Sequence, residues 1–121
     1  MSMRLHCNET IKQEATWADV EAVLPELKEE AYFRLMILPK PEIGPRSLEV
    51  QAENGNYLPL MPGTEGTGRS FYNPAAKGGE DVEILGNEYS PVRMTQDYDL
   101  IVRMIKEFFH TGNVSTELWN A

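Results

Sequence analysis

The side chains in this sequence that could act as nucleophiles or soft metal ligands are few and scattered. The one cysteine, Cys7, follows His6 directly, and the second histidine is His110. Neighbouring residues of a strand point to opposite faces, and two histidines with one cysteine do not make up a common structural zinc site. A Cys7–His110 pair would have to be assembled by the fold, because no local signature of a catalytic cysteine accompanies it. These residues therefore predict no metal site and no catalytic centre.

Two further patterns lack parts that chemistry would need. The glycine-rich stretch 62–69 has neither the glycine spacing of a dinucleotide fingerprint nor the lysine of a P-loop, and Glu65 in its middle would repel phosphate. Asp97 and Asp99 lack the rest of a calcium loop. Close carboxylate pairs are common in an acidic chain, so they are weak indicators of acid–base catalysis. We expect no cofactor, no metal and no enzymatic activity.

The charge of the chain indicates a class of partner. Eleven basic and nineteen acidic residues give a net charge of −8 and a pI of about 4.7. Residues 41–90 hold eight acids and three bases. Such a surface repels nucleic acids and anionic membranes, and it speeds association with a basic protein. Acidity also keeps proteins soluble, so charge alone does not decide between these two roles.

The length and composition predict one cytoplasmic domain. A chain of 121 residues has room for a single core, over residues 1–121. A single cysteine cannot form an intramolecular disulfide, which fits a reducing compartment. The N-terminus lacks the apolar stretch of a secretory signal, and the apolar run 35–38 is far shorter than the roughly 20 residues of a membrane span.

The apolar periodicity predicts the elements of the first half of the chain. Thr16 is a suitable N-cap for a helix over 17–30, which Pro25 should interrupt. The run 32–38 is apolar nearly throughout, as in a strand covered on both faces. Asn54-Gly55 predicts a two-residue hairpin turn of type I′.

That turn fixes which residues share a face. Ala52 would lie opposite Tyr57 and Val50 opposite Pro59 on an apolar face. The other face would combine acids with two leucines, which suits either partial cover by a helix or contact with a partner. Pro59 lacks an N–H and suggests a sheet edge or a bulge.

The second half of the chain contains the clearest helix. A wide apolar stripe spans 97–110, with Thr95 or Asp97 as a cap and Gly112 as the terminating residue. Short strands are expected at 70–73 and 81–85, the latter with Asp81 and Glu83 facing outward. We expect an α+β fold with a mixed or largely antiparallel sheet packed by two helices, the longer one C-terminal. Its core should bury Phe108, Phe109 and Trp119.

The C-terminal residues also resemble a known family. The segment Tyr89-Ser90-Pro91-Val92, the amphipathic helix, the run Phe108-Phe109-His110-Thr111-Gly112 and finally Leu118-Trp119 look like the ending of the first-numbered family of bacterial polymorphic-toxin immunity proteins. Upstream, Asn54-Gly55-Asn56-Tyr57-Leu58 resembles the hairpin of that family, and 83–86 resembles its strand and turn. The resemblance covers about 46–119. The tail departs from the family by lacking an acid after Trp119.

The resemblance implies a cytoplasmic antidote that binds and neutralises a cognate secreted toxin, often a nucleic-acid deaminase and sometimes a nuclease. Because such a toxin needs a basic substrate channel, an acidic protein could occlude it. We expect the contacts to come from acids, leucines and tyrosines of the middle segment, namely Glu49, Glu53, Leu58, Leu60, Glu65, Tyr72, Asp81, Glu83, Glu88 and Tyr89.

Two alternatives remain open from the sequence. One is a small enzyme or ligand-binding α+β domain with Cys7, or the region of Tyr72 and Tyr89, in a pocket. The other is a scaffold or regulatory subunit with a non-toxic partner. The sequence leaves the oligomeric state open.

Overall fold

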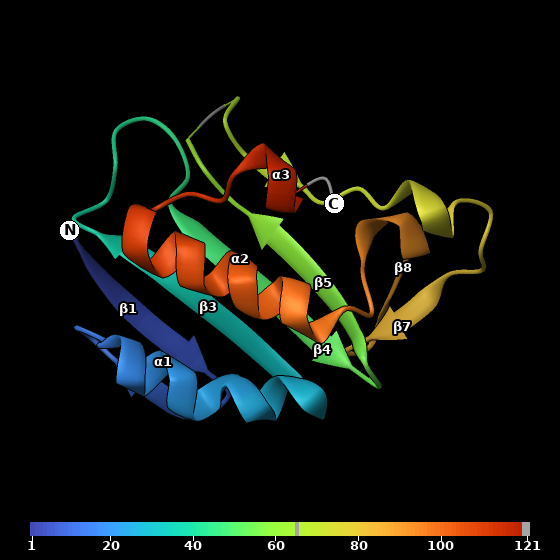
Figure 1. Ribbon diagram of the computed structural model, residues 1–121, viewed down its shortest axis with the longest axis horizontal. Helices are drawn as coiled ribbons and strands as arrows, with labels where there is room; N and C mark the ends of the chain where they lie inside the picture. Colours follow the sequence, from blue (N-terminus) through green and yellow to red (C-terminus); the bar gives the residue numbers. More distant parts are fainter. Residues whose placement is uncertain (65, 120–121) are drawn as a thin grey trace.

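The computed structural model describes residues 1–64 and 66–119, and its centre is an antiparallel sheet (Figure 1). The strand order is β2-β1-β3-β4-β5-β6, and each neighbouring pair is antiparallel. The strands are β1 (Ser2–Cys7), β2 (Thr10–Lys12), β3 (Ala31–Leu38), β4 (Ser47–Glu53), β5 (Asn56–Met61) and β6 (Arg69–Ser70). The α+β class and the largely antiparallel sheet are confirmed.

Two helical segments cover one face of this sheet, and the first of them is interrupted by a proline. α1 (Trp17–Val23) begins at Thr16, whose side chain forms a capping box with Asp19. Pro25 then ends the α-helix, and the chain continues as a 3-10 helix, Leu24–Lys28. The helix expected over 17–30 is therefore two pieces, as Pro25 indicated.

The longer helix, α2 (Tyr98–Thr111), lies over the middle strands of the sheet (Figure 1). The Asp97 side chain accepts a hydrogen bond from the Leu100 N–H, at 3.1 Å, so Asp97 and not Thr95 is the cap. Gly112 has φ of 77° and ends the helix in the left-handed region, which glycine adopts without strain. Among the described residues, no helix combines the length and the apolar character needed to cross a membrane.

The main core lies between this helical layer and the sheet. Alternate residues of β1 and β3 point into it, including Met3, Leu5, Phe33 and Leu35. Phe108 and Trp119 are buried there as expected, whereas Phe109 is only partly buried because it packs at the rim against Trp17. Trp119 belongs to a short C-terminal helix, α3 (Thr116–Trp119).

The hairpin of β4 and β5 has the expected register. Asn54 and Gly55 have φ of 53° and 77°, and Ala52 pairs with Tyr57 and Val50 with Pro59. The prediction of a sheet edge or a bulge at Pro59 holds only locally, because β6 extends the sheet beyond β5 but pairs with Leu60 and Met61 and not with Pro59. Pro59 instead falls in a gap in the pairing, between the Tyr57–Thr95 bridge and the β6 pairs. The missing N–H therefore leaves no ladder hydrogen bond unmade.

The second face of the sheet is only partly covered. A two-stranded arm, β7 (Val82–Ile84) and β8 (Asn87–Tyr89), lies beside the main sheet (Figure 1). Ile84 and Met94 pack on Leu58 in a small second core. The expectation that 32–38 is covered on both faces is wrong, because only alternate residues of β3 are buried and the others are half-exposed. The long hydrophobic stems of Arg34 and Met36 made the run look more buried than it is.

Candidate functional site

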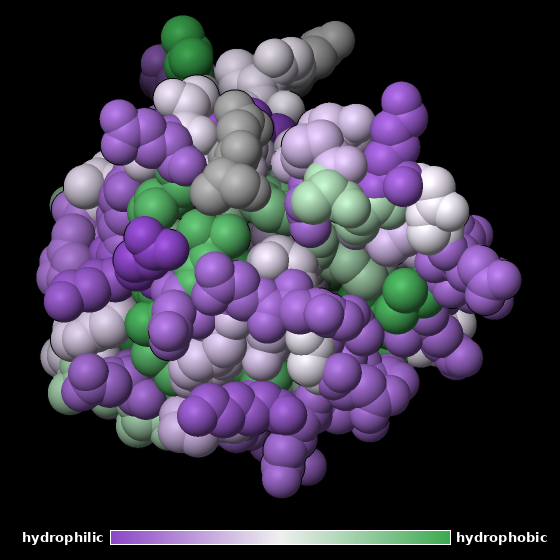
Figure 2. All heavy atoms as spheres, turned by 45° about the vertical axis from the view of Figure 1, so that its right-hand side comes forward, coloured by the Kyte–Doolittle hydropathy of each residue, from purple (hydrophilic) through white to green (hydrophobic). Residues whose placement is uncertain are grey.

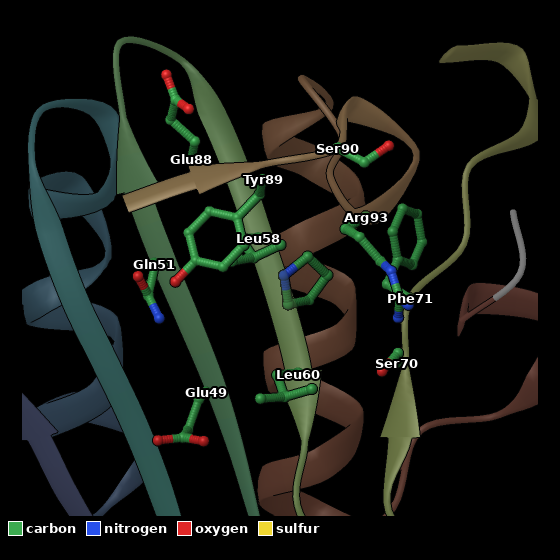
Figure 3. A pocket seen from close by; sticks show the side chains of 11 residues that line it. Glu49, Gln51, Leu58, Leu60, Ser70, Phe71, Glu88, Tyr89, Ser90 and Arg93 are labelled. Atoms are coloured by element: carbon green, nitrogen blue, oxygen red, sulfur yellow. The ribbon is translucent and has the colours of Figure 1, made fainter. Parts of the chain in front are cut away.

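A groove on this second face lies between the sheet and the arm (Figure 3). We call it the acidic groove. Its volume is about 420 Å³, and its lining residues come from β4, β5, β6, β8 and the turns beside them. They are Glu49, Gln51, Leu58, Pro59, Leu60, Ser70, Phe71, Glu88, Tyr89, Ser90 and Arg93.

The floor of the acidic groove is apolar. Leu58 and Leu60 project from β5 on the side away from the helices, because alternate residues of a strand share a face. Leu58 is buried beneath the arm, whereas Leu60 remains 40% exposed. Tyr89 lies over this floor from β8, as Figure 3 shows. On the side of the molecule that Figure 2 shows, polar side chains cover most of the surface, with apolar ones visible between them.

The arm is fixed to the sheet by Glu53. Its Oε1 atom accepts a hydrogen bond from the Leu85 N–H at 2.8 Å. Leu85 has a φ of 50°, which is unusual for a residue with a branched side chain, so this bond stabilises a strained turn. Glu53 therefore positions the arm, and its carboxylate is already engaged.

Acidic residues concentrate on the arm. Residues 80–89 contain four acids and no base. Glu83 and Glu88 pair directly across the two strands, and both are exposed. Like charges in directly opposite positions destabilise a strand pair. The arm thus carries an electrostatic repulsion that a cationic partner would relieve.

On the sheet, Glu49 is linked to Tyr32, whose hydroxyl donates a hydrogen bond to Glu49 Oε1. Burial and then this bond raise the pKa of Tyr32 to about 12, against the opposing influence of Arg34. The tyrosine therefore stays protonated at neutral pH and holds one oxygen of Glu49 in place beside the groove.

The wall opposite Glu49 depends on the C-terminal tryptophan. Trp119 Nε1 donates to the Ser70 carbonyl at 3.1 Å. The Phe71 ring stands edge-on to the Trp119 ring, with centroids 6.1 Å apart. The C-terminal residue that carries part of the family resemblance therefore supports the strand at the rim of the groove.

The structure brings half of the expected contact residues together. Glu49, Leu58, Leu60, Glu88 and Tyr89 line the acidic groove. The others lie elsewhere: Asp81 and Glu83 are exposed on the arm, Tyr72 is 49% exposed just beyond the wall, Glu53 is held by Leu85, and Glu65 lies outside the described residues.

Sequence reasoning missed the remaining wall residues. Ser70, Phe71 and Arg93 join the groove because the chain returns to β5 through β6 and then passes the arm. The short strand expected at 70–73 was the available signal for the first two, and the strand is in fact Arg69–Ser70. Nothing in the sequence around Arg93 indicated its place.

Cys7 lies far from these residues in the fold, in the main core. It is fully buried, and burial followed by the nearby charge of Glu26 raises its pKa to about 12. Reactive cysteines need access and a low pKa, and this thiol has neither. Over residues 1–64 and 66–119, no three His, Cys, Asp or Glu side chains gather in a way that could hold a metal ion.

The raised pKa values of Cys7 and Tyr32 predict alkaline instability. Each group keeps its proton in the folded protein to about pH 12, whereas the ordinary values are 9.0 for the thiol and 10.0 for the phenol. The unfolded chain therefore binds fewer protons between these limits, and the free energy of unfolding should fall as pH rises from 9 toward 12. Chemical denaturation across this range checks it, and Cys7→Ala should show a shallower fall. An equal slope in wild type and Cys7→Ala would contradict the role of the thiol.

Comparison with known proteins shows the family and supports the fold. No curated protein matches the chain. The crystal structure of a hypothetical protein from Neisseria gonorrhoeae is similar to it with a TM-score of 0.73 and 20% identity, covering 95% of this chain and 91% of that one. At this identity the likeness concerns the fold alone. Residues 2–118 match the Family of unknown function (DUF6911), and the chain belongs to that family.

Proposed function

We propose that this protein binds a basic protein partner through the acidic groove and the adjoining arm, and that the partner is a secreted toxin which it neutralises in the cytoplasm. The observation that carries the proposal is the groove itself, an apolar floor with an acidic rim on an open sheet face. Protein interfaces commonly combine an apolar and aromatic centre with a polar rim. Leu60 and Tyr89 supply such a centre here, and Glu49 and Glu88 the rim.

The charges of the arm specify the partner further. Glu83 and Glu88 lie opposite each other and are exposed, so a cation placed between or beside them would relieve their repulsion and form charge-assisted hydrogen bonds. A toxin that acts on nucleic acid presents lysines and arginines around its substrate site. Occlusion of that site by the arm would block the toxin without any chemistry by its inhibitor.

The resemblance to immunity proteins supports the toxin as the class of partner. Among the residues that carry it, Asn54-Gly55 forms the turn of the hairpin and Trp119 supports the wall, whereas Leu58 and Tyr89 line the groove itself. A family can keep such a framework while the surface residues adapt to different toxins.

The alternative is a small enzyme or ligand-binding domain. The volume of the groove lies within the roughly 300–1,000 Å³ of ligand pockets. Cys7, however, is remote from the groove and buried, and Tyr72 lies beyond its wall. The alternative therefore depends on Tyr89 and Arg93, and a ligand bound at these two residues without any protein partner would favour it.

The proposal predicts that charge reversal on the arm slows association. Asp81 and Glu83 are exposed, so the double substitution Asp81→Lys, Glu83→Lys should leave the fold intact. Because long-range attraction acts mainly on the encounter, the association rate with the toxin should fall about tenfold at low salt and less at high salt. Stopped-flow or surface-plasmon kinetics across a salt series measures this.

The matched control reverses two acids outside the arm. Glu14→Lys, Glu21→Lys changes the net charge equally, at exposed positions near α1. It should slow association much less. If both variants slow association equally, the net charge of the protein and not the arm controls the association rate. If the arm variant does not slow association, the arm is not part of the interface.

The proposed function itself is tested with the product of the neighbouring gene. If that gene encodes a toxin domain, the two purified proteins should form a complex of fixed stoichiometry on size-exclusion chromatography, and the complex should lack the activity of the toxin. A full-length toxin that stays active and unbound would contradict the proposal.

A further inference from the structure

A second cavity lies near the end of β3, with Arg34 and Met36 on the same face of the sheet as Glu49, and it has the opposite charge. Its volume is about 280 Å³, and it is lined by Arg34, Met36, Ile37, Lys40 and Arg46. Three of its five lining residues are cations, in a chain with nineteen acids against eleven bases. We call it the basic pocket.

The basic pocket is built from two fixed parts of the chain. Arg34 belongs to β3, whereas Lys40 lies near the start and Arg46 at the end of the loop between β3 and β4. The backbone of Arg46 is held on both sides: its N–H donates to the Pro62 carbonyl at 2.8 Å, and its carbonyl accepts from the Ile37 N–H at 2.9 Å. The Arg46 side chain thus starts from a fixed point beside β3.

The same loop is also tied to the 62–68 segment. Thr64 Oγ1 accepts from the Gly44 N–H at 3.1 Å, and the Gly44 carbonyl accepts from the Thr64 N–H, also at 3.1 Å. Gly63 fits closely beneath this contact, because a Cβ there would lie 2.9 Å from the Gly44 oxygen. The loop that carries Lys40 and Arg46 is therefore braced at its far end.

Two of the arginines that line the pocket have an unpaired hydrogen-bond donor. The Nε atoms of Arg34 and Arg46 are buried and have no hydrogen-bond partner. The same holds for Nε of Arg4, which pairs with Met36 across β1 and β3 and so lies next to the pocket. Buried donors are nearly always satisfied in folded proteins, and an unsatisfied one costs about 1–3 kcal/mol. Two of the three cations that line the cavity therefore have an unsatisfied donor, which points to a missing acceptor.

From this convergence we propose that the basic pocket binds a small phosphate-type anion through Arg34, Arg46 and Lys40. The planar guanidinium group presents parallel N–H donors that match the oxygens of a phosphate, and the lysine adds a compact positive charge. The anion would offset the repulsion among the three cations. The pocket adjoins the acidic groove, because Arg34 in the pocket pairs directly across β3 and β4 with Glu49 in the groove.

The charge distribution limits the size of this ligand. The acidic chain outside the pocket repels a long polyanion such as a nucleic acid, because each additional phosphate would approach a negative surface. A single compact anion gains the local attraction without that cost. The expected ligand is therefore inorganic phosphate or one phosphate monoester group of a small metabolite.

The test is a titration of the uniformly ¹⁵N-labelled full chain with inorganic phosphate at constant ionic strength, using chloride as the reference salt. Amide signals of Lys40 and Arg46 should shift saturably, and those of the arm should not. Lys40→Gln, at an exposed side chain, should weaken the affinity about tenfold. Arg103→Gln, which removes an exposed cation from α2, should leave it unchanged.

Two further titrations define the ligand. Adenosine monophosphate that binds more tightly than phosphate identifies an organic phosphate as the natural ligand, and equal affinity identifies the free anion. Acetate binding as tightly as phosphate would overturn the phosphate assignment. Shifts that do not saturate, or that persist unchanged in Lys40→Gln and in Arg46→Gln, would overturn the site. None of these results depends on the acidic groove having a protein partner.

Discussion

Replacing Trp119 with alanine should lower the free energy of unfolding by about 3–5 kcal/mol, the usual cost of removing a large aromatic side chain from a core. Trp119 is 1% exposed and contacts Phe71. It also donates to the Ser70 carbonyl, and the Arg69 guanidinium lies 5.5 Å from its ring centroid. The alanine variant leaves a cavity and an unpaired carbonyl at the wall of the acidic groove, so both stability and groove shape should suffer. Chemical denaturation measures the loss.

Two companion variants separate the causes. Trp119→Phe keeps most of the apolar volume but loses the donor to Ser70, and it should cost about 1–2 kcal/mol. Leu118→Ala removes a half-buried neighbour on the same short helix and should cost less than Trp119→Ala. A loss below about 1 kcal/mol for Trp119→Ala would show that the tryptophan is not part of the core and would remove the support we assign to the groove wall.

The second large effect is expected at the centre of the acidic groove. Leu60→Arg places a cation on the exposed part of the floor, opposite Glu49 on β4. A basic partner would then meet a like charge in a desolvated position and lose an apolar contact, so its affinity should fall about a hundredfold or more. The variant itself should be nearly as stable as wild type, because surface substitutions rarely exceed about 0.5 kcal/mol.

The matched control is Ile11→Arg. Ile11 is 50% exposed and lies on the same face of the sheet, since it pairs with His6 at the opposite edge. It undergoes the same change in size and charge but lies outside the groove. Calorimetric titration with the toxin should find the affinity of this variant close to wild type. If Ile11→Arg weakens binding as much as Leu60→Arg, the contact surface extends over the sheet or lies at the β2 edge.

The parts of the fold that were predicted correctly have local signals. The Asn54-Gly55 turn needs two positive φ angles that few other dipeptides accept, and its identity alone determined the register of β4 and β5. Asp97 and Gly112 mark the ends of α2 through hydrogen bonds and dihedral angles within one turn. Pro25 likewise acts on its immediate neighbours.

The parts that were missed depend on contacts between distant segments. β1 was not predicted, although Met3, Leu5 and Cys7 alternate with polar residues, because six residues with that pattern have many possible partners in the chain. Its pairing with β3 joins residues about thirty positions apart. The basic pocket is a similar case, since Arg34 and Arg46 meet only after β3 and β4 have paired.

The candidate site was predicted in composition and not in shape. The mixed acid-and-leucine face of the hairpin indicated Glu49, Leu58 and Leu60, and all three line the groove. What closes the groove is the arm, whose position depends on the Glu53 bond to Leu85. That bond spans thirty-two residues and involves a backbone donor, which no side-chain pattern reveals. Glu53 was expected to contact a partner, which stays a prediction, and its role in holding the arm was not foreseen.

The most direct measurement is amide hydrogen exchange of this protein with and without the proposed toxin partner. The account predicts slower exchange in the complex over 80–93, the arm and the turn that follows it, with the strongest effect around Glu88 and Tyr89. Exchange in α1 should be unchanged. Protection confined to α1 and the 3-10 helix after it, with the arm unaffected, would contradict a partner bound at the acidic groove.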